Sequence, residues 1–510
     1  MDLLRDQKQT PGFAEVLKMS WPASLAMLNT TVIKFVDGLM VSYLGHSEFS
    51  AQYASGMLAF APEAFAMGLL LVVNTYVSQN FGAGRHRRSG QYAWAGIFLA
   101  LGFATLIVPL VALARPIFSA LNHSEQLQGL EVMYFRYMIL AAFLTLPSRV
   151  LEQFFFGIHR PRIVLTISLI ANAFNVLANY ALIFGRFGLP AMGLEGAAIG
   201  SVSAWTLQLV ILLVVFVSPR VHRTFGTLFV RSVRRRHCAE LLRIGWPAGV
   251  QLCNDVLCWG LFTVVLVGTF FGKVHMAATT VAMRYLGLSF MPALGIGIAT
   301  TALVGRYIGA GRLDLARKRV HQALLVAMIY MGLCGLAFWM FRYPMVRFLL
   351  ENVPSTLAAE TRAQEIAATV DIAVKIMLCA AVFQLFDAVG IVYIGALRGA
   401  GDVLWPMAVT AILSWGIILG GGYMMVIHLP WLTSIGPWIT ASAYVMVLGI
   451  FMARRFESGA WRRINLLGRA RKVQPTPVAD PIAGMPELAA TEEPQSPEER
   501  AAGMGEPDLR

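Results

Sequence analysis

The sequence is poor in charge. Charged residues make up only 14% of its 510 residues, and 57% are hydrophobic, whereas a soluble domain usually carries about 25% charged residues. A deficit spread over nearly the whole length excludes a soluble enzyme. The net charge of +13 does not indicate a nucleic-acid partner, because the 41 lysines and arginines lie mostly between apolar runs. That distribution is typical of an integral membrane protein.

Cysteine is also scarce. The five cysteines form no CxxC pair, and four of them lie inside apolar runs. This pattern excludes a disulfide-stapled secreted domain and favours small buried hydrophobic residues over metal or redox chemistry. The nine histidines are scattered, and no cluster of acids, His or Cys indicates a membrane-embedded enzyme. We therefore expect no enzymatic activity and no cofactor.

Long apolar runs dominate what is present. A membrane-spanning helix needs roughly 20 apolar residues, and twelve stretches meet this length. They lie near residues 18–44, 52–80, 91–114, 131–156, 161–184, 194–217, 241–271, 276–305, 320–341, 366–397, 403–428 and 435–453. The sequence thus predicts an all-α integral membrane protein with twelve transmembrane helices. At 457–510 it predicts a basic and then disordered tail, rich in Pro, Glu and Ala.

Basic residues gather in alternate loops. Sixteen lysines and arginines lie in 82–90, 157–162, 218–240 and 306–319, whereas the intervening loops carry few or dilute them with glutamate. Cytoplasmic loops carry the excess of Lys and Arg. The pattern therefore predicts that both termini and the 218–240 linker lie in the cytoplasm.

An internal repeat indicates the architecture. Ser20-Trp21-Pro22-Ala23 recurs as Gly245-Trp246-Pro247-Ala248, and Gly82-Ala83-Gly84-Arg85 recurs as Gly309-Ala310-Gly311-Arg312. Nearly the same length of chain separates the two copies of each motif, so the motifs keep a common register. Six helices per half is an even number, so both halves have the same orientation, and we expect them to be related by a pseudo-two-fold axis along the membrane normal. The predicted units are an N-lobe at 1–217, a linker at 218–240 and a C-lobe at 241–456.

Three aspartates stand out inside the apolar runs. Asp37, Asp255 and Asp387 lie in the first, seventh and tenth predicted helices. Charges in a bilayer are expensive and mark functional sites. A carboxylate in a partly dehydrated cavity can hold a proton near neutral pH, bind Na⁺ or attract a cationic compound. The alternative is a structural ion pair, and Lys34 lies only one helical turn from Asp37.

Further polar residues are weaker candidates. Glu63 follows Pro62 in the second predicted helix and either faces a cavity or has a capping or kink role. Asn175 and Asn179 lie one turn apart on the fifth predicted helix, where the alternative is a polar contact between helices.

The motifs together resemble the multidrug and toxic compound extrusion (MATE) family, and its NorM branch in particular, over about residues 13–456. The first half carries Trp21-Pro22, Val36-Asp37-Gly38, the Gly82–Arg85 loop and the Asn175 to Asn179-Tyr180 stretch. The second half carries Trp246-Pro247, Asp387-Ala388-Val389 and the run from Gly395 to Asp402, which is the most specific of these marks.

The resemblance implies an antiporter of the bacterial inner membrane that exports cationic or lipophilic drugs and toxic compounds as H⁺ or Na⁺ enters, by alternating access. By motif position, Asp37, Asp255 and Asp387 correspond to the family's acidic residues, and Asn175 and Asn179 to its helix-5 polar pair. Ser201 lies near a hydroxyl position on the sixth helix. The expected partners are organic cations or lipophilic drugs and the bilayer. We expect a monomer, because the path lies within one chain.

Two departures from the family pattern bear on the coupling ion. The helix-7 acid is Asp255 where this branch usually has Glu. Phe383 replaces a residue that is often Tyr in Na⁺-coupled relatives, and phenylalanine offers no oxygen ligand. Although a Na⁺ site at Asp255 and Asp387 stays open, we favour H⁺. The alternative function is a flippase for lipid-linked saccharides or peptidoglycan precursor on the same scaffold, which would favour a cationic path.

Overall fold

The computed structural model describes residues 12–121, 123–229, 233–351 and 359–467, and within these ranges the regular secondary structure is entirely helical. The predicted tail at 457–510 therefore lies largely outside the described residues. Each half of the chain contributes six membrane-spanning helices. In the N-terminal half these are α1 (Gly12–Ser42), α2 with α3 (His46–Leu70 and Val72–Gly82), α4 (His86–Ile107), α6 (Glu125–Gly157), α7 (Pro161–Phe184) and α8 (Gly193–Val217).

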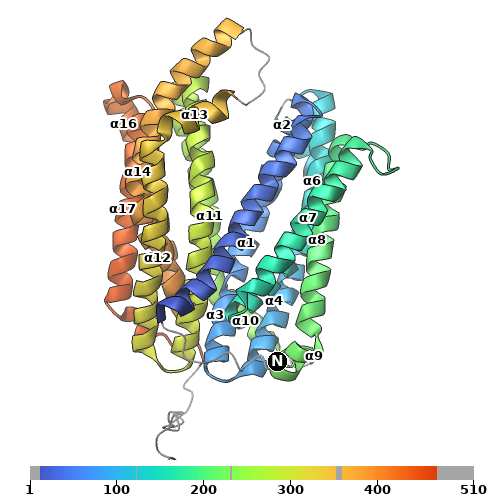
Figure 1. Ribbon diagram of the computed structural model, residues 1–510, viewed down its shortest axis with the longest axis vertical. Helices are drawn as coiled ribbons and strands as arrows, with labels where there is room; N and C mark the ends of the chain where they lie inside the picture. Colours follow the sequence, from blue (N-terminus) through green and yellow to red (C-terminus); the bar gives the residue numbers. More distant parts are fainter. Residues whose placement is uncertain (1–11, 122, 230–232, 352–358, 468–510) are drawn as a thin grey trace, which may run out of the picture. The chain divides into compact units, whose positions relative to one another are not determined.

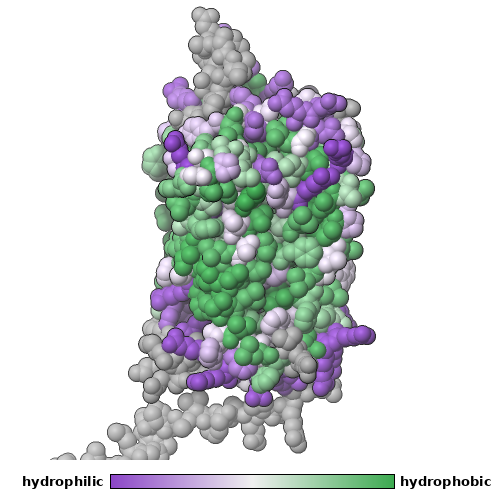
Figure 2. Space-filling model, turned by 90° about the vertical axis from the view of Figure 1, so that its right-hand side faces the viewer, coloured by the Kyte–Doolittle hydropathy of each residue, from purple (hydrophilic) through white to green (hydrophobic). Residues whose placement is uncertain are grey.

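The C-terminal half repeats this order with two π-helical segments inserted. Its spans are α10 with η2 (Arg235–Leu261 and Phe262–Thr269), α11 (Lys273–Gly309), α12 (Leu313–Met340), α14 (Ala359–Ala400), α15 with η3 and α16 (Leu404–Leu413, Ser414–Gly421 and Gly422–His428), and α17 (Ile435–Glu457). Figure 2 shows a broad hydrophobic belt between hydrophilic residues at the two ends of the helices. The predicted all-α protein with twelve transmembrane helices is confirmed.

Each half also has a short helix that the sequence analysis did not predict. In the N-terminal half, α5 (Pro109–Ser119) follows α4, and in the C-terminal half α13 (Arg342–Glu351) follows α12 at the equivalent place. The third span was expected at 91–114. This range includes the break between α4 and α5, because residues 110–113 continue the apolar pattern beyond it. Within the predicted linker lies α9 (Pro219–Phe225), and α10 begins at Arg235, ahead of the expected position.

The repeated loops have the same backbone conformation. Gly84 and Gly311 have φ of +71° and +73°, values that glycine adopts without steric strain. The next residue donates its backbone N–H back into the preceding helix in both copies, from Arg85 to Asn80 O and from Arg312 to Tyr307 O, at 2.8 Å each. The repeat seen in the sequence is thus a repeat of three-dimensional structure. We call the end of the molecule that carries these loops the arginine-rich end.

The two halves pack against each other through glycines that follow the same repeat. A Cβ atom on Gly295 of α11 would lie 2.5 Å from Cα of Ser24 on α1, and a Cβ atom on Gly68 of α2 would lie 2.9 Å from Cα of Gly249 on α10. Gly68 and Gly295 are equivalent positions, because the register of the repeated loops aligns one with the other. Each half therefore places the start of its first helix against a glycine in the second span of the other half.

Hydrogen bonds strengthen this contact toward the arginine-rich end. Gln79 donates to Gly399 O (2.9 Å), and Tyr76 donates to Glu240 O (3.1 Å). Glu15 on α1 accepts bonds from Tyr307 and Arg319, both at 2.7 Å. Figure 1 shows this contact region at the lower end of the view, where α3, α10 and the start of α1 lie.

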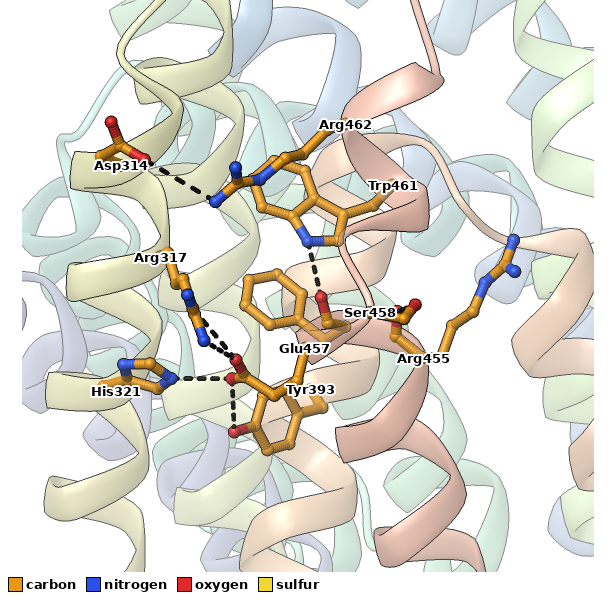
Figure 3. Close-up of polar contacts among 10 residues, drawn as sticks. Asp314, Arg317, His321, Tyr393, Arg455, Glu457, Ser458, Trp461 and Arg462 are labelled. Atoms are coloured by element: carbon orange, nitrogen blue, oxygen red, sulfur yellow. Dashed lines mark hydrogen bonds and ion pairs between the residues drawn. The ribbon is translucent and has the colours of Figure 1, made fainter.

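The last membrane helix is tied to its own half at the same end. Glu457 at the end of α17 accepts hydrogen bonds from Arg317 and His321 of α12 and from Tyr393 of α14 (Figure 3). The indole of Trp461 donates to Phe456 O at 2.9 Å, so the chain folds back against the end of α17. These bonds fix α12, α14 and α17 as one unit.

The glycine contact between the halves yields a first prediction. Gly295→Leu is expected to lower the unfolding temperature of the detergent-purified protein, because a side chain there overlaps the α1 backbone and overpacking costs about 1–3 kcal/mol. Gly287→Leu on the same helix is the matched control, since a Cβ there would meet nothing within 4 Å. Equal unfolding temperatures for the two variants would contradict the packing described.

Candidate functional site

The first acidic site lies in the N-terminal half, where α1 faces α7. The side-chain amide of Asn179 on α7 donates to Oδ1 of Asp37 at 2.8 Å and to Oδ1 of Asn175 at 3.1 Å. Asn175 and Asn179 are buried, and Asp37 is half-buried. Asp37 is therefore held by a neutral donor. Among the described residues no ion pair joins it to Lys34, so the structural ion pair considered from the sequence is absent there.

The second acidic site lies in the C-terminal half. Asp255 on α10 and Asp387 on α14 are half-buried and interact electrostatically with each other. Tyr444 on α17, itself buried, interacts with both carboxylates, and Arg398 on α14 interacts with Asp255. Within the described residues neither aspartate takes part in an ion pair. The site thus gathers two carboxylates and a phenol that are not held by direct ion pairs.

A polar strip borders this second site. Asn254 donates to Oγ of Ser414 at 2.9 Å and accepts from the indole of Trp415 at 2.8 Å. Ser414 is the first residue of the π-helical segment η3. Such segments occur frequently at functional sites because they reorient side chains within a helix. The amide and hydroxyl oxygens here are acceptors of the type that can coordinate an alkali cation or receive a hydrogen bond from a hydronium ion.

A third group of charges lies in the N-terminal half and is separate from Asp37. Arg149 on α6 pairs with Glu152 at 2.9 Å, and Gln208 on α8 donates to the other oxygen of Glu152 at 2.8 Å. Glu63 on α2 interacts electrostatically with Arg149 and with Lys34 on α1. We call these five residues the Lys34 cluster. Glu63 therefore belongs to a charged cluster, rather than having only a capping role.

The two remaining predicted residues, Ser201 and Phe383, lie in different halves, and neither bonds to one of the aspartates. Ser201 is buried on α8 beside Gly200, at which a Cβ atom would collide with the Asn179 side chain. It therefore flanks the first acidic site without bonding to Asp37. Phe383 is 4% exposed and packs in an apolar cluster with Phe262 and other residues of the C-terminal half, so it contributes no polar group to the second site.

Several residues of these sites were missed from the sequence. Arg149 and Glu152 satisfied the criterion that singled out the aspartates, because both lie within the apolar span 131–156, one helical turn apart. Asn254 directly precedes Asp255. Tyr444 gave no signal, since one tyrosine in an apolar helix is ordinary and its proximity to the aspartates depends on how α17 packs.

Two matching halves of six membrane-spanning helices, with acidic groups set inside the apolar helices of both, define a membrane transporter of the parallel-repeat class. The MatE family model matches residues 22–181 and 247–424. The two matched segments begin at the equivalent prolines of the repeat, Pro22 and Pro247. The chain belongs to the MatE family, and it is a transporter and not an enzyme. The resemblance inferred from the motifs is confirmed.

Similar proteins extend over nearly the whole chain. A probable multidrug resistance protein NorM of Thermotoga maritima is 24% identical, covering 90% of this chain and 95% of its own. One of Mesorhizobium japonicum is 28% identical, covering 86% and 92%. Both alignments leave only a short part of either chain unmatched.

Solved structures show the same fold. A crystal structure of MATE in complex with MaL6 has a TM-score of 0.80 at 19% identity, covering 89% of this chain and 98% of the other. A MOP superfamily transporter from Pyrococcus furiosus, described as having a binding pocket of reverse polarity, has a TM-score of 0.78 at 19% identity, covering 90% and 100%.

The first acidic site yields a second prediction. Asn179→Leu is expected to destabilise the protein by about 1–3 kcal/mol, because it leaves acceptors on Asp37 and Asn175 without their donor. In an Asp37→Leu background the loss should be smaller, since one of those acceptors is gone. Unfolding in detergent of the two single variants and the double variant measures this coupling.

Asn172→Leu is the matched control for that cycle. Asn172 lies on the same helix and donates to the backbone oxygen of Asn29, not to Asp37. Its effect should be the same with and without Asp37. Additive effects for Asn179 and Asp37 would show that the bond between them contributes nothing to stability.

Proposed function

We propose that the chain is a secondary antiporter that exports lipophilic organic cations in exchange for H⁺ or Na⁺ by alternating access. The observation that carries this proposal is the state of the three aspartates. Asp37 is bound by an amide, and Asp255 and Asp387 have no ion pair among the described residues. Their charges are therefore available to a cation, a proton or a substrate, which is the property that coupling requires.

The coupling needs only that the driving ion and the drug prefer different states of the protein. An ionised carboxylate attracts an organic cation, and a protonated or Na⁺-bound carboxylate does not. We favour H⁺, because the buried Phe383 supplies no oxygen ligand. The names of the relatives from Thermotoga maritima and Mesorhizobium japonicum support drugs as the cargo.

The arginine-rich end is proposed to be cytoplasmic, in the bacterial inner membrane, with both termini on that side. Its loops carry the excess of Arg and Lys that cytoplasmic loops carry. The contacts between the halves at Glu15, Gln79 and Gly295 lie toward this end. In the proposed cycle these contacts hold the cytoplasmic side closed and must separate before a compound can enter from the cytoplasm.

A third prediction tests antiport directly. Purified protein in liposomes loaded with a fluorescent cationic dye is expected to release the dye under an inward H⁺ gradient or an inward Na⁺ gradient, imposed separately. Asp387→Asn should lower the release at least tenfold, because the amide can neither ionise nor exchange a proton. The dye fluorescence measures the rate.

Asp371→Asn is the control on the same helix. Asp371 is exposed and pairs with Lys375 one turn away at 2.7 Å, so its loss should leave transport intact. Full transport by Asp387→Asn would refute the proposed role of that residue. Folded wild-type protein that moves no dye under either gradient would redirect the assignment to the lipid flippase.

A fourth prediction tests the closed cytoplasmic side. Glu15→Ala removes the acceptor shared by Tyr307 and Arg319 and should raise the population in which the two halves are apart at this end. Spin labels at Arg88 and Lys318, one on each half, report the change as longer distances in electron paramagnetic resonance. The labels require a background in which the five native cysteines are replaced.

Asp314→Asn serves as the control for that experiment. Its side chain is 90% exposed and its partner Arg462 is 3.7 Å away within the same half. The distance distribution of this variant should match that of the background. An unchanged distribution in Glu15→Ala would mean that the ion pairs of Glu15 do not hold the halves together.

A further inference from the structure

We propose that Arg398 is a positioning residue of the antiport, which acts through Asp255: its positive charge weakens the binding of the driving cation, H⁺ or Na⁺, at the second acidic site and so favours release of that cation. The inference rests on the proposed antiport and goes beyond it, because the coupling described above uses no basic residue. It also gives a role to the run from Gly395 to Asp402, the most specific motif of the sequence.

Arg398 carries its charge without a direct partner. The residue is half-buried, and its side chain makes no hydrogen bond or ion pair with the described part of the chain. Its Nε atom is buried and has no acceptor. An arginine that ties two elements together does so by donating its N–H groups to carbonyl or carboxylate oxygens. Arg398 makes no such bonds, so it acts on its surroundings through its charge.

That charge acts on the second acidic site. Arg398 interacts electrostatically with Asp255. The other titratable groups that act on Asp255 are Asp387 on α14, Tyr444 on α17 and Cys258 on α10, and all three are acids. In the part of the chain that the structure describes, Arg398 is therefore the basic group that opposes a cation at this site. The opposition is strong because charges interact over longer distances in a low-dielectric interior than in water.

The position of Arg398 connects this site to the contact between the halves. On α3 of the opposite half, Thr75 donates to the backbone oxygen of Arg398 and Gln79 donates to that of Gly399, both at 2.9 Å. Asp387 lies eleven residues earlier on α14, about 16 Å farther from the arginine-rich end. Long side chains lean toward the N-terminus of their helix, which directs the guanidinium from the contact toward the aspartates. When the halves separate at this end, Arg398 can serve as the counter-charge that replaces the departing cation.

The N-terminal half shows that the scaffold does not require an arginine at this position. The N–H of Asp402 donates to the carbonyl of the residue before Arg398. In the same way, the N–H of Arg160 donates to the carbonyl of the residue before Phe156. These bonds end the equivalent helices α14 and α6 and align Arg398 with Phe156, which is fully buried. The arginine therefore belongs to the half that contains the paired aspartates, and an apolar ring suffices in the other half.

The experiment measures how strongly the driving cation binds. Export of a fluorescent cationic dye from proteoliposomes is followed while the external concentration of the driving cation is varied. The proteins are wild type, Arg398→Gln, Arg398→Lys and the control Lys318→Gln. Lys318 is an exposed lysine of α12 near the same end, so its removal changes the net charge equally but at a solvent-screened position.

Arg398→Gln is expected to reach half of its own maximal rate at a concentration of the driving cation that is lower by about fivefold or more. Its maximal rate should fall, because the cation leaves more slowly. The sign is the same for either ion, since removal of a positive charge tightens cation binding; for H⁺ the midpoint moves to higher pH. Arg398→Lys and Lys318→Gln should keep the wild-type concentration. The amount of folded protein does not affect this concentration, so partial loss of folding cancels.

Several results would overturn the inference. An unchanged half-saturating concentration in Arg398→Gln, even with a lower rate, would show a structural role. An equal shift in Arg398→Lys or Lys318→Gln would show that the charge at this position is not the cause. Arg398→Met is the second neutral variant, and loss of folding in both neutral variants would assign Arg398 to the fold instead. Wild-type protein that moves no dye under either gradient would refute the antiport itself.

Discussion

The contact between the two halves rests on the close approach of helix backbones at Gly68 and Gly295. In a membrane the hydrophobic effect does not drive helices together, so association depends on van der Waals packing and on hydrogen bonds that small residues make possible. Each glycine receives the start of the opposite half's first helix, at Ala248 and Ala23. The Trp-Pro motif of each half is therefore an interface element. Its tryptophans, Trp21 and Trp246, are each 44% exposed.

A second constraint is that charges inside the helices must be compensated, and this chain compensates them in different ways. Arg149 and Glu152 neutralise each other and have a structural character. Asp37 is held by an amide, which orients the carboxylate without cancelling its charge. Lys34 has no ion pair within the described part of the chain, and Glu63 and Arg149 act on it electrostatically. A group is a stronger candidate for function when its charge is less completely compensated by neighbouring groups.

Composition and repeat predicted the helices, their order and the duplicated loops, because all of these depend on patterns that are local in sequence. The contact glycines Gly68 and Gly295 were not singled out from the sequence, although the common register of the two halves aligns one with the other. The π-helical segments η2 and η3 could not be predicted in this way. An apolar run has the same composition whether its backbone hydrogen bonds join residues four or five positions apart. The partner of Asp37 likewise depended on the packing of α1 against α7, which decides that Asn179 and not Lys34 reaches it.

The halves share a scaffold but differ in chemistry at equivalent positions. When the two halves are aligned on Trp21 and Trp246, the position of Asp37 is occupied by Phe262. Phe262 is fully buried and contacts the rings of Trp259 and Trp438. Trp259 in turn is the equivalent of Lys34. Where the N-terminal half places a carboxylate and an ammonium, the C-terminal half places aromatic rings. The carboxylates of the C-terminal half, Asp255 and Asp387, stand at other positions of the repeat than Asp37, so under the proposed function the two halves attract a cation at non-equivalent places.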